Sequence, residues 1–174
     1  VDSARSVRRR ILSGRLAGVL AVALVATAVR ADEASDQYAV AAGHYQAQRW
    51  QLAAEEFETF LNRYPDHADR NQSVFFLAEA LLQLGKYSQA RQRFQQYLAL
   101  ELEGRFSKPA LFREGEAAYL SDDYETAKAS LGKFHQRYAD DPLNAFVLTY
   151  LGGIALAEQN WAGAEQHYRQ CLET

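Results

Sequence analysis

Four copies of one eleven-residue pattern decide the fold: WQLAAEEFETF at residues 50–60, YSQARQRFQQY at 87–97, YETAKASLGKF at 124–134 and WAGAEQHYRQC at 161–171. Each copy begins with an aromatic residue, has alanine at its fourth position and has a large side chain at its eighth. The copies are 37 residues apart, without an insertion. A fixed spacing of this length indicates an array of structural repeats.

A second set of positions precedes each copy. A small residue recurs, followed four residues later by a larger one: Ala41 and Tyr45, Ala78 and Leu82, Gly115 and Tyr119, Gly152 and Leu156. Large residues recur at three- and four-residue spacing on both sides of a short break, which predicts two helices per repeat. The breaks are expected at Gln48-Arg49, Gly85-Lys86, Asp122-Asp123 and Gln159-Asn160. No segment alternates with a period of two, so we predict an all-α solenoid in which neighbouring repeats cover each other.

These positions resemble the tetratricopeptide repeat, whose pattern ends in alanine, three residues, phenylalanine and a later proline. Ala53, Phe57 and Pro65 fit that ending. The resemblance implies a right-handed α–α superhelix of about four helix-turn-helix repeats, near residues 34–70, 71–107, 108–144 and 145–174. No polar capping helix follows the fourth repeat, so we expect the natural chain to continue beyond Thr174.

The phrase FETFLNRYPD at residues 57–66 and the period of 37, rather than 34, narrow the resemblance. Both features are similar to repeats of the bacterial cell envelope. Examples are the periplasmic cell-division coordinator of the Tol-Pal system and the helical lipoprotein of outer-membrane β-barrel assembly. This chain lacks the lipid-anchoring cysteine of that lipoprotein, and it has no long coiled-coil segment before its first repeat.

Residues 1–31 resemble an export signal. They hold six arginines and one acid, and an uncharged apolar stretch runs over residues 16–29. Fourteen helical residues reach about 21 Å, short of a hydrocarbon core of about 30 Å, so a cleaved signal is favoured over an uncleaved anchor. Cleavage is expected after Ala28 or Ala31. Arg8 and Arg9 leave twin-arginine export open beside the general route.

Export changes the charge of the protein. The whole chain has 19 basic and 22 acidic residues, and removing residues 1–31 leaves 13 and 21, a net charge of −8. An acidic domain without a basic run does not favour binding to nucleic acid or to an anionic membrane surface. We therefore expect protein or peptide partners, no nucleic acid and no membrane span after cleavage.

The sequence offers no constellation for catalysis, for a metal or for a cofactor. Its four histidines are far apart, and the chain has no HExxH, CxxC, GxSxG or P-loop pattern. The single cysteine, Cys171, occupies the position of Phe60, Tyr97 and Phe134 in the other copies, so we expect a buried packing residue rather than a nucleophile. We predict a protein that is not an enzyme.

Partner binding is expected on the concave face, which the first helices line in tetratricopeptide repeats. Carried over by position, the expected binding residues are Tyr38, Tyr45, Phe75, Phe76, Glu79, Phe112, Arg113, Glu116, Tyr119 and Tyr150, with Thr149 beside them. Lysine- and asparagine-based clamps for carboxylates are absent from these positions. Aromatic and acidic groups favour a peptide with apolar and basic side chains, although several of these rings could instead pack against neighbouring helices.

Two functions remain compatible with the sequence. The favoured one is an exported, non-catalytic interaction scaffold of the cell envelope, in the periplasm or secreted. The alternative is the N-terminal recognition arm of a longer secreted enzyme or membrane-associated protein. Self-association through the uncapped C-terminal end is a further option.

Overall fold

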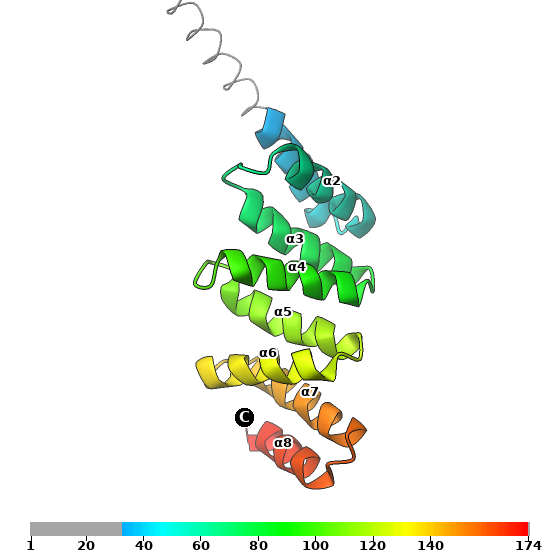
Figure 1. Ribbon diagram of the computed structural model, residues 1–174, viewed down its shortest axis with the longest axis vertical. Coiled ribbons are helices and arrows are strands. Elements are labelled where there is room, and N and C mark those ends of the chain that lie inside the picture. Colours follow the sequence, from blue (N-terminus) through cyan, green and yellow to red (C-terminus); the bar gives the residue numbers. More distant parts are fainter. Residues whose placement is uncertain (1–32, 174) are drawn as a thin grey trace, which may run out of the picture.

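A computed structural model describes residues 33–173 of the chain as a stack of helices. The predicted signal peptide and its cleavage sites lie outside these residues. The first helix covers residues 33–46, and it is followed by α2 (Trp50–Arg63), α3 (Arg70–Gln83), α4 (Tyr87–Leu100), α5 (Ser107–Leu120), α6 (Tyr124–Arg137), α7 (Asn144–Ala157) and α8 (Trp161–Glu173). Figure 1 shows the labelled helices following one another down the long axis.

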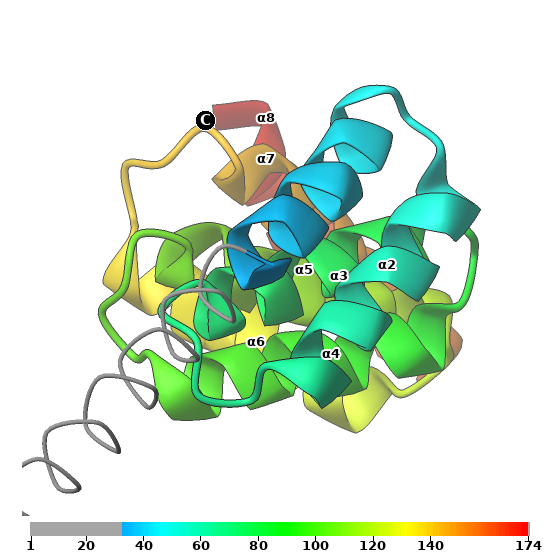
Figure 2. The same cartoon turned by 90° about the horizontal axis from the view of Figure 1, so that it is seen from above.

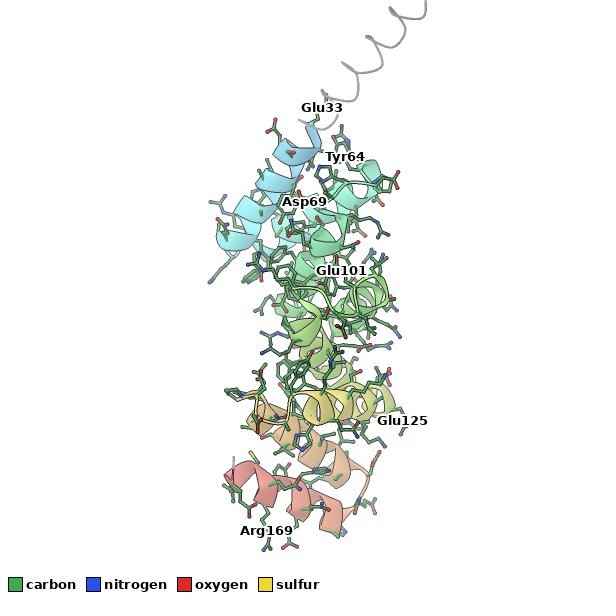
Figure 3. The ribbon with its side chains drawn as sticks, turned by 90° about the vertical axis from the view of Figure 1, so that its left-hand side faces the viewer. Glu33, Tyr64, Asp69, Glu101, Glu125 and Arg169 are labelled. Atoms are coloured by element: carbon green, nitrogen blue, oxygen red, sulfur yellow. The ribbon has the colours of Figure 1, made fainter. Side chains whose placement is uncertain are left out.

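The order of contacts is that of a solenoid. From α2 onward, each helix packs chiefly against the helix before it and the helix after it. No strand occurs within residues 33–173. The predicted all-α solenoid of helix pairs is therefore confirmed. In Figure 3, Glu33 lies at one end of the stack and Arg169 at the other.

The turn inside each repeat has the same backbone form. Its second residue has a positive φ in all four copies: 55° at Gln48, 71° at Gly85, 59° at Asp122 and 59° at Gln159. The next residue donates its backbone N–H to a carbonyl five residues earlier, as from Lys86 to Leu81 at 2.9 Å. This pattern closes a helix with a left-handed residue. All four turns lie at the predicted breaks.

Small residues allow the two helices of a repeat to approach closely. Ala41, Ala53, Ala78 and Ala90 have no exposed surface. In the third repeat, a Cβ atom on Gly115 would lie 2.6 Å from Cγ of Leu131, well inside van der Waals contact. The small position is therefore a requirement of the crossing between α5 and α6.

The core consists of two clusters that meet at α5. The first cluster extends from the first helix to α4 and includes Ala110 and Ala117 of α5. The second joins α5, α6 and α7 through Phe112, Phe134 and Val147. Figure 2, seen from above, shows α5 near the middle of the projection. None of the helices within residues 33–173 combines the length and the apolar character that crossing a bilayer requires.

Candidate functional site

Two of the ten predicted binding residues belong to the core. Phe75 is 6% exposed and stacks on Phe106 with ring centroids 4.6 Å apart. Phe112 is 4% exposed and packs edge-on against Phe134 of α6, at 5.8 Å. These rings turn toward the second helices of their repeats, so they stabilise the fold and do not line an accessible surface.

Tyr38 is separated from the other predicted residues. It is half-buried, and its ring packs against Phe57 at 6.0 Å and Phe60 at 5.7 Å. Burial, with the negative charge of Asp69 as the second cause, raises the pKa of its phenol. Thr149 is exposed and donates its hydroxyl hydrogen bond to the carbonyl of Ala145.

Four of the predicted residues form two aromatic pairs. The rings of Tyr45 and Phe76 have centroids 4.9 Å apart and an interplanar angle of 55°. The rings of Tyr119 and Tyr150 also lie 4.9 Å apart, at 47°. Each member of the second pair is 74 residues, or two repeats, after its equivalent in the first. All four side chains are partly exposed.

Three charged residues lie along the first helices between these pairs. Arg113 Nε is 3.2 Å from a Glu79 carboxylate oxygen, and another guanidinium nitrogen is 2.5 Å from Glu116. The hydroxyl of Tyr150 donates to the other oxygen of Glu116 at 2.8 Å. We call these seven residues the first-helix strip: Tyr45, Phe76, Glu79, Arg113, Glu116, Tyr119 and Tyr150.

The titratable side chains of the strip have pKa values that are shifted by burial and by their neighbours. Glu79 is 8% exposed, and burial raises the pKa of its carboxyl against the opposing effect of Arg113. Its Oε1 is paired with Nε of Arg113 at 3.2 Å. Burial and the bond to Glu116 raise the pKa of Tyr150, so this phenol stays neutral at physiological pH. With both carboxylates ionised, the strip has a net charge of −1.

One notable residue was missed by the sequence reasoning. Glu114 of α5 is 7% exposed and accepts a hydrogen bond from the hydroxyl of Ser130 at 2.8 Å. The equivalent positions in the other repeats are Val40, Leu77 and Leu151. The sequence could have indicated this residue, since a carboxylate stands at a position that is otherwise aliphatic. Burying a charged group is costly unless it is paired.

The described residues offer no evident metal site. No group of three or more histidine, cysteine, aspartate or glutamate side chains within residues 33–173 is placed to hold an ion. Cys171 is only partly buried, and its Sγ lies 3.3 Å from the carbonyl of Ala145, so the expectation of full burial is wrong. α8 is the last described helix, and no further helix within residues 33–173 covers it.

Comparison with protein families finds the tetratricopeptide repeat. The family model matches residues 37–67 and 109–141, which lie in the first and third repeats. These are also the repeats that carry Tyr45 and Tyr119. No curated protein matches the chain. The family match and the helical solenoid together support a tetratricopeptide repeat protein.

Proposed function

We propose that this tetratricopeptide repeat protein is an exported, non-catalytic scaffold of the bacterial cell envelope that binds segments of partner proteins along its first-helix strip. Tetratricopeptide repeats generally mediate interactions between proteins, and the all-helical repeat fold is typically non-catalytic. The observation that supports this proposal is the first-helix strip, which has two partly exposed aromatic pairs and an acidic charge cluster between them.

The strip favours a partner with apolar and basic side chains. Aromatic rings offer rigid contact area at a low cost in conformational entropy. Arg113 is already flanked by two carboxylates, so a further acidic group would meet net repulsion there, whereas a lysine or arginine of the partner would find Glu79 and Glu116. The partner segment would therefore place apolar residues on the aromatic pairs and a basic residue between them.

Binding can be tested with substitutions that the chain itself already contains. Tyr45→Leu and Tyr119→Leu copy Leu82 and Leu156 at the equivalent positions, so both variants are expected to fold. Peptides selected from a random library on the intact protein should lose about tenfold in affinity for each variant, since anchor residues contribute on the order of 1–2 kcal/mol.

The matched control is Trp161→Tyr, which copies Tyr87 and Tyr124 on a second helix. Its affinity for the same peptides should be unchanged. Selected peptides that bind all three variants as well as the parent protein would contradict the proposed binding surface.

Export is tested separately. Residues 1–31 fused to a reporter enzyme that is active only outside the cytoplasm should give activity, and Leu20→Arg in the apolar stretch should abolish it. Replacing Arg8 and Arg9 by lysine distinguishes twin-arginine export, which should fail, from the general route, which should tolerate the change. A silent fusion would refute the envelope location and leave the binding proposal standing.

A further inference from the structure

A groove of about 630 Å³ lies between α4 and α6, over α5. Cavities that hold small molecules have volumes of about 300–1,000 Å³. One wall is apolar, with Leu98 on α4 and Leu102 just after it, and Leu102 is 67% exposed. The opposite wall is basic, with Lys133 and Arg137 one turn apart on α6. The groove is therefore amphipathic across its width.

The groove one repeat earlier can be compared with this one position by position, and its charged residues differ. It lies between α2 and α4, has a volume of about 510 Å³ and includes the glutamines 89, 92 and 96. An ion pair between Glu58 and Arg93, at 3.0 Å, spans it. The equivalents of that pair in the second groove are Gln95 and Ser130, which form no such link. The second groove lacks an ion pair at this position, and the pair between Arg137 and Glu103, at 2.8 Å, links its two sides next to Leu102 instead.

The lining charges of the second groove favour an anion. Lys133 has no carboxylate within 4 Å among residues 33–173, while Arg137 pairs with the exposed Glu103 at 2.8 Å. Glu114 lies at the floor, where it is buried and accepts the hydroxyl of Ser130. Two cations and one buried carboxylate give the lining residues a net charge of +1, which Glu103 beside Arg137 offsets, so Lys133 is the lining cation without a paired carboxylate among residues 33–173. In the earlier groove, Lys133 is replaced by Gln96.

We propose that the groove between α4 and α6 binds an anionic amphiphile. Its aliphatic chain lies against Leu98, Leu102 and Leu111, and its carboxylate or phosphate head group meets Lys133 and Arg137 on the opposite wall. The head group replaces Glu103 beside Arg137, which costs little because that ion pair is exposed. This site does not share residues with the first-helix strip and does not depend on the proposed scaffold function.

The test uses the intact chain and four probes with the same twelve-carbon tail, each below its micelle concentration. Dodecanoate and dodecyl phosphate carry anionic heads from the two chemical sources, dodecan-1-ol is neutral and dodecyltrimethylammonium is cationic. Calorimetric titration should give the anions at least a fivefold advantage over the alcohol and a larger one over the cation. Methyl resonances of Leu98, Leu102 and Leu111 should shift on binding. Equal affinity for all four heads, or shifts confined to other leucines, would overturn the proposal.

Three variants copy other repeats and locate the site. Lys133→Gln, which copies Gln96, should weaken anion binding about three- to tenfold and leave dodecan-1-ol unchanged. Leu102→Ala, which copies Ala139, should weaken all tails. Gln95→Glu combined with Ser130→Arg introduces the ion pair that Glu58 and Arg93 form in the earlier groove, and it should abolish binding while helicity by circular dichroism is retained. If the double variant misfolds, Lys133→Gln decides: unchanged selectivity for the anions in that variant refutes the site.

Discussion

In each turn between the two helices of a repeat, one residue has a left-handed backbone, yet only Gly85 is a glycine. Gln48, Asp122 and Gln159 adopt the same conformation with a side chain, which costs on the order of 1–2 kcal/mol for an L-residue. The surrounding helix pair imposes this geometry on whichever residue occupies the position. The turns therefore store a small, repeated strain.

This strain predicts the effect of Gly85→Gln, which introduces the residue found in the first and fourth repeats. A Cβ atom there would have only Tyr87 nearby, at 3.9 Å, so space is available and the backbone alone opposes the change. We expect a loss of about 1 kcal/mol in the free energy of unfolding, measured by urea denaturation. A variant as stable as the parent would show that the turn relaxes.

Glu114 predicts a pH effect on stability. Burial raises the pKa of this carboxyl above its usual 4.5, against the weaker, lowering effects of the bond from Ser130 and of Lys133. A raised pKa in the folded state means that the group favours folding when protonated, and that this contribution is lost as the pH rises through the folded-state pKa. Glu114→Gln keeps an acceptor for Ser130 but cannot ionise. It should stabilise the protein more at pH 7.5 than at pH 4, and an equal effect at both pH values would contradict this.

At the scale of the helix, the glycines Gly115 of α5 and Gly132 of α6 have different roles. Gly115 lies in the crossing between α5 and α6, whereas Gly132 of α6 has no atom within 4 Å of an added Cβ. The repeat pattern identified Gly115 as part of a small column, and the structure supplies the reason in the contact with Leu131. Gly132 has no such role and only lowers the helix propensity of α6.

The two glycines therefore form a matched pair of predictions. Gly115→Ala should lower the free energy of unfolding by about 1–3 kcal/mol through overpacking, since the methyl group would lie 2.6 Å from Leu131. Gly132→Ala should raise it by about 0.5–1 kcal/mol. Both values come from denaturant melts under one condition, and a change of the same sign in both variants would refute the distinction.

Much of the element level was predictable from the sequence, and the site was less so. Helix pairs, their breaks and their small columns follow from a fixed spacing of 37 residues, since spacing alone decides which residues share a helix face. Position on a first helix did not decide exposure. Phe75 and Phe112 occupy one position of the repeat and turn to the core because second helices cover them. Phe76 and Tyr150 occupy the next position of the repeat and stay partly exposed. That difference depends on rotation of the helix against its neighbours, which one sequence does not reveal.

For the molecule as a whole, stability should vary along the stack. In a solenoid, each repeat contacts only its neighbours, so an end helix is held from one side. Ala164 is the only residue of α8 within the described part that is fully buried, whereas α5 has seven buried residues and belongs to both core clusters. The centre should therefore be the last part to open.

Amide hydrogen exchange tests this gradient. Residues 161–173 should exchange in a partial opening well before residues 107–120, whose exchange should require global unfolding. Mass spectrometry of peptides covering the two helices gives both rates in one experiment. Equal protection of the two helices would show that the array unfolds as a single cooperative unit.

The spacing of the two aromatic pairs gives the protein a second length scale. Its architecture repeats every 37 residues, but the pairs Tyr45–Phe76 and Tyr119–Tyr150 are related by 74. A scaffold that binds a ligand at both pairs selects the ligand by the distance between its two contact points. Loss or gain of one repeat between them would leave the helices stacked and yet change the ligand length that fits, so the number of repeats would be constrained by recognition and not only by folding.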